Sequence, residues 1–163
     1  MTAETRNRLA NSQAELVRAL VARGPMPAGF DVSRIRAAAR SLVSKRRQAL
    51  THAWPRLVRG LGDAFVERFS AYATANPLPR SASTLADGCA FLAWLDREQP
   101  LNDDLRIEAI SFDVRFVDAP TGLRRRRGFV VKWAKLRDSG TRILAVRLPW
   151  LGERWWRFPR RKP

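Results

Sequence analysis

The sequence predicts an α+β fold, in which a small bundle of about five helices is followed by a small three-stranded antiparallel β-sheet. Two observations predict it. Apolar residues recur every three to four positions in the first hundred residues, and every second position from residue 107 onward; these are the periods of a helix and of a strand with one buried face. A chain of 163 residues, 45% of them hydrophobic, is long enough to bury a core. We therefore expect a helical bundle domain in residues 1–100 and a basic, Trp-rich sheet region in residues 101–163.

The first two helices are predicted from long apolar stripes. Residues 9–23 carry one such stripe, and Gly24 with Pro25 supplies a stop after it. After a short linker, Asp31 or Ser33 caps a second helix. The inner stripe of this second helix is Ile35, Ala38, Ala39, Leu42 and Val43. Its outer face is basic and holds Arg34, Arg36, Arg40, Lys45, Arg46 and Arg47.

Three shorter helices follow. One lies in residues 50–62 with Pro55 in its first turn, the position where a missing N–H costs least. Asp63 caps the next helix, and the prolines in residues 76–79 end it because proline cannot continue the hydrogen-bond ladder. Residues 83–84 open the fifth helix. The large side chains expected at the centre of the bundle are Trp54, Phe65, Phe69, Phe91 and Leu92.

The predicted sheet begins where the period changes. A first strand is predicted from apolar residues that alternate with polar ones, namely Ile110, Phe112, Val114 and Phe116. Residues 129–136 and 141–148 are further strands, and residues 137–140 form a hairpin turn between them. Residues 155–158 would extend this sheet.

Positive charge is concentrated at the end of the chain. Residues 121–163 hold 14 of the 31 Lys and Arg, only two of the 15 Asp and Glu, and four of the six Trp, which gives them +12 of the net charge of +16. Cations interleaved with aromatic rings form a surface that attracts polyanions or packs against a partner chain. The run at 124–127 is expected in a loop between strands. The candidate partner- or anion-binding residues are Arg124, Arg125, Arg126, Arg127, Arg154, Trp155, Trp156 and Arg157.

The residue inventory favours no catalytic or metal chemistry. The chain has one histidine, His52, and one cysteine, Cys89, without a second group at a spacing that completes a nucleophilic triad or a metal cluster. We expect no catalytic residue, no metal ligand and no cofactor, and we interpret Asp103 and Asp104 as a helix cap or a solvated turn. There is no apolar run of membrane-spanning length and no signal peptide pattern, so we expect a cytoplasmic protein without membrane contact.

Motifs of the helical part resemble a known family. The matching segments are Leu16 to Leu20, Gly29 to Asp31, Arg34, Arg40, Lys45-Arg46, Ala53 to Pro55, Leu61 to Asp63, Phe65, Phe69, Ala71-Tyr72, Pro77 and Leu85 to Gly88. They resemble the DNA-binding-domain family that includes the methanobactin biosynthesis subunit MbnC and actinobacterial accessory proteins of TIM-barrel enzymes. The resemblance covers residues 14–95, about half of the chain, and its motifs are packing and turn signatures.

The resemblance implies a non-catalytic accessory protein. In such systems a TIM-barrel multinuclear iron enzyme oxidises cysteines of a ribosomally made precursor peptide, and the accessory subunit binds that enzyme and the leader of the peptide. An extended leader would pair with an exposed sheet edge, and an acidic leader would be attracted by the arginines at 124–127. The residues alone also allow DNA binding, with Arg124 to Arg127, Arg154, Arg157 and residues 160–162 neutralising phosphates. No helix-turn-helix, RNA-binding motif or zinc finger is recognisable, so we expect the accessory function and keep nucleic-acid binding as the alternative.

Overall fold

The computed structural model describes residues 3–22, 31–79, 83–119 and 122–159. Its helices are α1 (Ala3–Ala22), α2 (Val32–Ala53), α3 (Pro55–Leu61), α4 (Ala64–Ala75), α5 (Thr84–Glu98) and α6 (Asp103–Arg115). Its strands are β1 (Phe116–Ala119), β2 (Gly122–Arg125), β3 (Val130–Lys135), β4 (Arg142–Leu148) and β5 (Gly152–Phe158). The predicted stop at Gly24 and Pro25, the linker after it, and Arg160, Arg161 and Lys162 lie outside the described residues.

The five predicted helices are confirmed as α1 to α5. Asp31 caps α2, since its carboxylate accepts hydrogen bonds from the amides of Ser33 and Arg34 at 2.8 and 3.3 Å. Pro55 opens α3 as predicted, and Gly62 ends that helix with a φ of 53°. The predicted centre of the bundle is also confirmed, because all five large side chains are buried together: Trp54, Phe65, Phe69, Phe91 and Leu92.

The strand predicted over residues 110–116 is wrong, because those residues up to Arg115 belong to α6. This helix is buried on two opposite sides. Ile110 and Val114 are four residues apart and pack toward the sheet, whereas Phe112 packs into the bundle core. Two helical stripes that are offset by two residues produce the same alternation as a half-buried strand.

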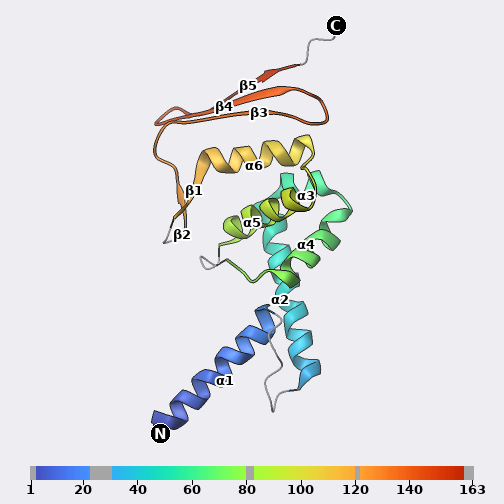
Figure 1. The fold of residues 1–163 in the computed structure, drawn as a ribbon, viewed down its shortest axis with the longest axis vertical. Coiled ribbons are helices and arrows are strands. Elements are labelled where there is room, and N and C mark those ends of the chain that lie inside the picture. Colours follow the sequence, from blue (N-terminus) through green and yellow to red (C-terminus); the bar gives the residue numbers. More distant parts are fainter. Residues whose placement is uncertain (1–2, 23–30, 80–82, 120–121, 160–163) are drawn as a thin grey trace.

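The three-stranded antiparallel sheet exists in the order β3-β4-β5, which confirms the α+β class. β3 and β4 are the strands predicted at residues 129–136 and 141–148, and the third strand is β5. A separate antiparallel pair, β1 and β2, precedes the sheet. Figure 1 shows α6 as a middle layer, with the sheet on one side and the bundle on the other. The division at residue 100 stays a prediction.

The N-terminal part extends away from these layers. In Figure 1, α1 and the first turns of α2 project from the bundle, and the sheet lies at the far end of the molecule. Among the described residues, no helix is both long enough and apolar enough to cross a membrane.

Candidate recognition surface

The sheet β3-β4-β5 has one covered face. Ile143 and Ala145 of β4 are fully buried, and they pack with Ile110 and Val114 of α6 and with the half-buried Trp155. Because side chains alternate along a strand, the residues between these point to the opposite side.

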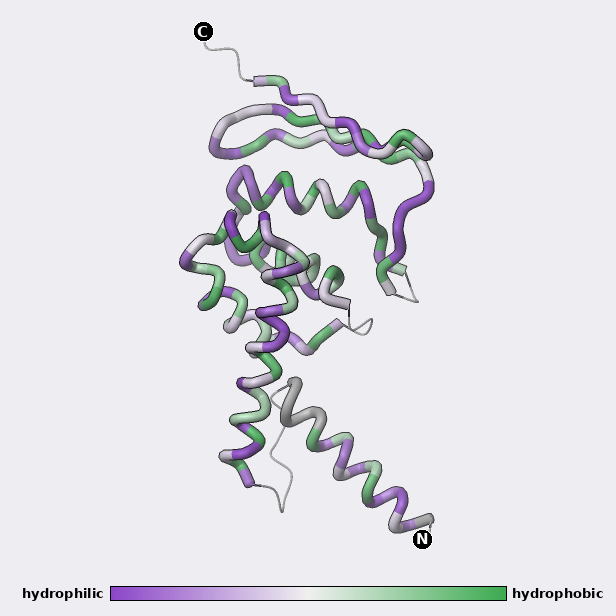
Figure 2. Tube along the Cα trace, turned by 180° about the vertical axis from the view of Figure 1, so that it is seen from behind, coloured by the Kyte–Doolittle hydropathy of each residue, from purple (hydrophilic) through white to green (hydrophobic). Residues whose placement is uncertain are grey.

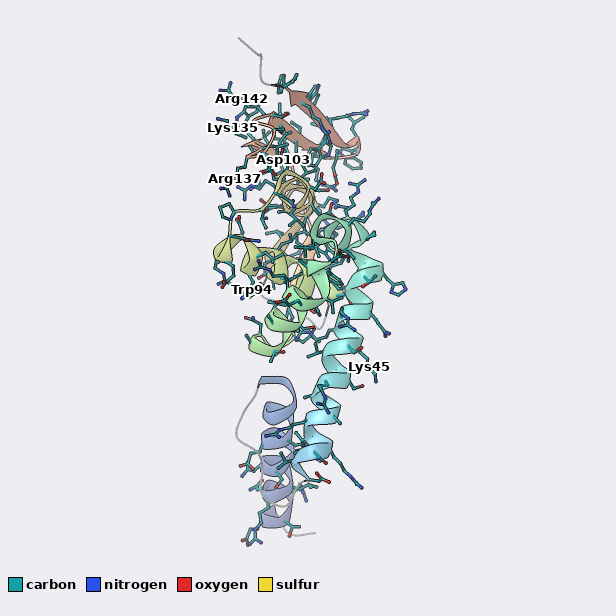
Figure 3. All side chains as sticks on the ribbon, turned by 90° about the vertical axis from the view of Figure 1, so that its right-hand side faces the viewer. Lys45, Trp94, Asp103, Lys135, Arg137 and Arg142 are labelled. Carbon is teal, nitrogen blue, oxygen red and sulfur yellow. The ribbon has the colours of Figure 1, made fainter. Side chains whose placement is uncertain are left out.

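We call that opposite side the outer face. Its apolar side chains are Val131, Trp133, Leu144, Val146, Trp156 and Phe158. The rings of Trp133 and Phe158 contact each other, with centroids 5.6 Å apart. Three exposed cations, Lys135, Arg142 and Arg154, share this face, and Figure 3 shows the first two side by side. No helix or strand of the described chain covers the outer face (Figure 1).

The four predicted site residues of β5 divide between the two faces. Trp155 and Arg157 point toward the α6 side, where Trp155 is half-buried, and Arg154 and Trp156 belong to the outer face. β5 pairs with β4 along all of its length, from Gly152 to Phe158. Its other edge carries no strand in the described part of the chain. β5 therefore offers unpaired main-chain groups.

The arginine run at 124–127 is only partly a loop. Arg124 and Arg125 lie in β2, so the predicted loop is wrong for these two residues. Arg124, Arg125 and Arg127 are exposed, and none of them forms an ion pair with any residue that the structure describes. The run leads out of β2 toward β3, and Figure 2 shows a hydrophilic stretch where the chain passes from the β1–β2 pair to the sheet.

Arg126 differs from its neighbours because it is half-buried and its guanidinium is hydrogen-bonded. Its Nε donates to the carbonyl oxygens of Asp113 and Phe116 at 2.8 and 2.9 Å, and its Nη2 lies 3.0 Å from Asp113 Oδ1. Lys132 Nζ lies 2.5 Å from the other carboxylate oxygen of Asp113. Burial raises the pKa of Asp113, but these two cations outweigh it, so the pKa lies below its ordinary value of 3.8. Arg126, which directly follows β2, thus ties this strand to the end of α6. The sequence does not indicate which of the four arginines has this role.

Asp103 fastens the other end of α6 to the sheet. Its carboxylate accepts from the amides of Asp138 and Ser139, each at 2.9 Å, and Asp138 in turn accepts from the amide of Asp103 at 3.1 Å. Burial raises the pKa of Asp103, but the hydrogen bonds from Ser139 and Asp138 lower it further, so the net pKa lies below 3.8. The interpretation of Asp103 and Asp104 as a helix cap or a solvated turn is wrong, because both residues lie in the first turn of α6 and Asn102 is its cap.

Sequence reasoning missed Trp150 as a surface residue. It lies in the turn between β4 and β5, has a φ of 75° and is fully exposed. A non-glycine residue with positive φ is uncommon, and such strain is frequent at binding sites. The signal in the sequence is Pro149 before it and Gly152 after it, a pattern typical of turns.

A pocket of about 820 Å³ lies between α5, α6 and the β1–β2 pair. Cys89 lines it and is half-buried. Burial, followed by the charges of Asp113 and Asp118, raises the pKa of the Cys89 thiol, so it stays protonated at neutral pH.

His52 is exposed, and its Nδ1 lies 2.8 Å from the carbonyl oxygen of Gln48 on the same helix. Within the described ranges, no group of three or more His, Cys, Asp or Glu side chains is arranged to hold a metal ion.

The comparisons with known proteins concern the helical part. Residues 10–97 match the family described as "SCO6045-like, C-terminal domain", and this match covers more than half of the 163 residues. The chain belongs to this SCO6045-like family. A UPF0276 protein of Streptomyces avermitilis is 40% identical over 73 residues, which are 45% of the present chain and only 15% of that relative. No solved structure matches.

Within the SCO6045-like segment, the motif residues hold the helices together. Arg46 of α2 forms two hydrogen bonds with Asp87 of α5, at 2.7 and 3.1 Å; the Asp87 side chain is almost fully buried, and that of Arg46 is 12% exposed. Its Nη1 donates to the carbonyl oxygens of Ala73 and Asn76 at the end of α4. The hydroxyl of Tyr72 donates to Asp87 at 3.2 Å. The Asp87 carboxylate therefore joins three helices.

Trp54 and Gly88 form a second joint in the same segment. A Cβ atom on Gly88 would lie 2.3 Å from Nε1 of Trp54, so only glycine fits beside this indole. The indole stacks on Phe112 of α6, with ring centroids 5.0 Å apart. These residues of the matched segment thus hold the bundle together, and the candidate recognition surface lies outside that segment.

Proposed function

We propose that this chain is a non-catalytic accessory subunit that binds a TIM-barrel multinuclear iron enzyme and the leader of a ribosomally made precursor peptide. In this role the iron ligands and the oxidative chemistry belong to the enzyme, and the present chain supplies recognition. The Streptomyces avermitilis relative supports a partnership, because the matched segment is a small part of a much longer protein. A domain that is fused to a larger protein in one organism can act, in another organism, as a separate chain that binds the counterpart of that larger protein.

The observation that carries the proposal is the open edge of β5. This strand has seven residues, contains no proline, and is paired on one side only in the described chain. Natural proteins usually blunt such an edge, unless another chain pairs with it. An extended peptide would add a fourth strand there, with affinity from main-chain hydrogen bonds and selectivity from side chains on alternate faces. Trp155 would contact the peptide on one face, and Trp156 on the other.

Charge supports an acidic peptide. Arg154 and Arg157 project from β5 itself, and Arg124, Arg125 and Arg127 are unpaired cations within the described residues. Such a field raises the rate at which an acidic chain meets its site, and this effect weakens as salt screens the charges.

Two measurements test the proposal. Co-expression with the proposed TIM-barrel iron enzyme should give a complex that survives gel filtration, because stable interfaces gain mainly from apolar burial. A labelled leader peptide should bind. In a paired peptide only every second N–H group faces β5, so N-methylation of those alternate residues should abolish binding, whereas N-methylation of the residues between them should not. Separate elution of the two proteins together with no peptide binding would refute the proposal.

Nucleic-acid binding remains the second candidate, and one observation favours it. The outer face presents exposed aromatic rings beside Lys135, Arg142 and Arg154, which is a combination found on single-strand binding surfaces. It predicts affinity for a random oligonucleotide with a steep dependence on salt.

A further inference from the structure

We infer that the outer face of the sheet is the docking surface for a folded partner protein whose own surface is apolar at its centre and acidic around it. The inference rests on the proposed function, in which this partner is the TIM-barrel enzyme. It gives the enzyme a surface that is distinct from the β5 edge proposed for the peptide.

The outer face is more apolar than the solvent side of an antiparallel sheet ordinarily is. Such a sheet usually alternates between apolar residues inside and polar residues outside. Here the exposed fractions are 48% for Val131, 56% for Trp133, 46% for Trp156 and 45% for Phe158. Leu144 and Val146, which are half-buried, fill the centre between these residues. Contiguous apolar surface of this kind marks an interaction site, and tryptophans at the centre of an interface dominate its energy.

The charges around this face decide which partner fits. Lys135 lies opposite Arg142 in the β3–β4 register, and Arg154 adds a third cation. Glu153, which precedes Arg154 in sequence, points to the other face, where it pairs with Arg115 and Arg147 at 3.6 and 3.7 Å. Asp138, in the turn between Lys135 and Arg142, accepts a hydrogen bond from the amide of Asp103. A second copy of this chain would bring the same cations against these three, and like charges at an interface are repulsive. An acidic protein surface complements them.

The packing of the rings favours a protein over a nucleic acid. A stacking platform needs ring faces that are free for bases. Trp133 and Phe158 instead lean on each other at an interplanar angle of 37°, and aliphatic side chains occupy the space beside them. This composition, aromatic anchors with aliphatic filling inside a polar rim, is that of a protein interface.

The docked partner would lie next to the leader peptide. Trp156 belongs to the outer face, and it also lies on the edge strand β5 that is proposed to pair with the peptide. One subunit would thereby hold the enzyme and its substrate side by side, which is the arrangement that raises the local concentration of the substrate at the enzyme.

The test compares variants in the complex with the enzyme. Trp133→Ala removes an anchor of the outer face, and a double variant, Lys135→Glu with Arg142→Glu, reverses its rim charges. The matched control is Arg36→Glu with Arg40→Glu, the same charge change on exposed positions of α2 at the other end of the molecule. Enzyme affinity is measured by biolayer interferometry at several salt concentrations, and circular dichroism verifies folding.

We expect Trp133→Ala to weaken enzyme binding at least about 30-fold, as loss of a central anchor does. The Lys135→Glu, Arg142→Glu variant should slow association about 10-fold or more at low salt. The control variant should keep both the affinity and the association rate within about twofold of the wild type. Wild-type complex formation that neither outer-face variant changes would overturn this inference and leave the proposed function intact. A wild-type chain that binds no enzyme would overturn both. Quenching of tryptophan fluorescence by a single-stranded oligonucleotide, lost in Trp133→Ala, would assign the face to nucleic acid.

Discussion

At the scale of single residues, a buried ion pair organises the helical part. Arg46 and Asp87 satisfy each other, and the other donors of Arg46 satisfy two carbonyl oxygens at the end of α4. Burial and the Asp87 carboxylate raise the pKa of Tyr72, so its hydroxyl stays protonated and donates to that carboxylate. A charge in such a place is tolerated only because every partner is present.

Replacement of Asp87 by Asn should therefore lower the free energy of unfolding by about 3–5 kcal/mol, because it leaves the buried charge of Arg46 uncompensated. Tyr72→Phe removes only one hydrogen bond and should cost about 1 kcal/mol. Urea denaturation of both variants measures the difference. Equal losses in the two variants would show that the ion pair does not hold the helices together.

Gly88 offers a steric test of the same region. An alanine Cβ would overlap the Trp54 indole, which is fixed between α5 and α6, so Gly88→Ala should cost about 1–3 kcal/mol or more. Gly128→Ala is the matched control, because nothing lies within 4 Å of the added atom. Thermal melting compares the two, and a Gly88→Ala variant as stable as the control would contradict the packing described above.

At the scale of elements, α6 joins the two parts of the molecule. Its first turn is tied to the β3–β4 turn through Asp103 and Asp138. Its last turn is tied through Asp113 to Arg126, the residue after β2, and to Lys132 of β3. Both Asp103 and Asp113 have a pKa below the ordinary value of 3.8. Each contributes stability that is present above that value and is lost as the pH falls through the lower, folded-state pKa.

We therefore expect the attachment of the sheet to weaken as the pH is lowered below about 4, in the window set by these two lowered pKa values. Near-ultraviolet circular dichroism of the tryptophans follows this loss. The double variant Asp103→Asn with Asp113→Asn should be less stable at pH 7, and its stability should change less between pH 5 and low pH. If stability depended on pH in the same way in the wild type and in the variant, Asp103 and Asp113 would not be the groups that attach the sheet to α6.

The same helix explains what the sequence could and could not predict. The five helices of the bundle were predictable because each presents one apolar stripe and a recognisable start or end. In α6 both sides are buried, so Phe112 and Ile110 suggest a period of two although each belongs to a helical stripe. The better signal was local: Asn102 is a capping residue, acidic residues follow it in the first turn, and Arg115 lies in the last turn.

For the candidate surface, composition identified the segment but not its geometry. The excess of arginine and tryptophan after residue 121 was visible in the sequence. The register between β4 and β5 decides which of Trp155 and Trp156 lies on the outer face. The position at which α6 ends decides that Arg126 forms the hydrogen bonds described above. Both are set by contacts between elements that are distant in the chain, which no local pattern encodes.

At the scale of the whole molecule, the part shared with the SCO6045-like family and the proposed recognition surface are separate. The matched residues 10–97 build the bundle, and the unpaired edge, the exposed rings and most of the excess charge lie beyond α6. The bundle and α6 together act as a support that holds the sheet, and the sheet is where we propose that peptide and enzyme meet.

Parallel salt titrations test this proposal most directly. They compare the wild-type chain with a triple variant, Arg124→Ser, Arg125→Ser and Arg127→Ser, which spares the internal Arg126, against the acidic leader peptide and against a random DNA duplex. We predict that the wild type binds the peptide, that the triple variant binds it more slowly mainly at low salt, and that neither prefers the duplex. The contrary result is duplex binding whose logarithmic salt slope falls by about 0.9 for each arginine lost, with no measurable peptide binding by the wild type.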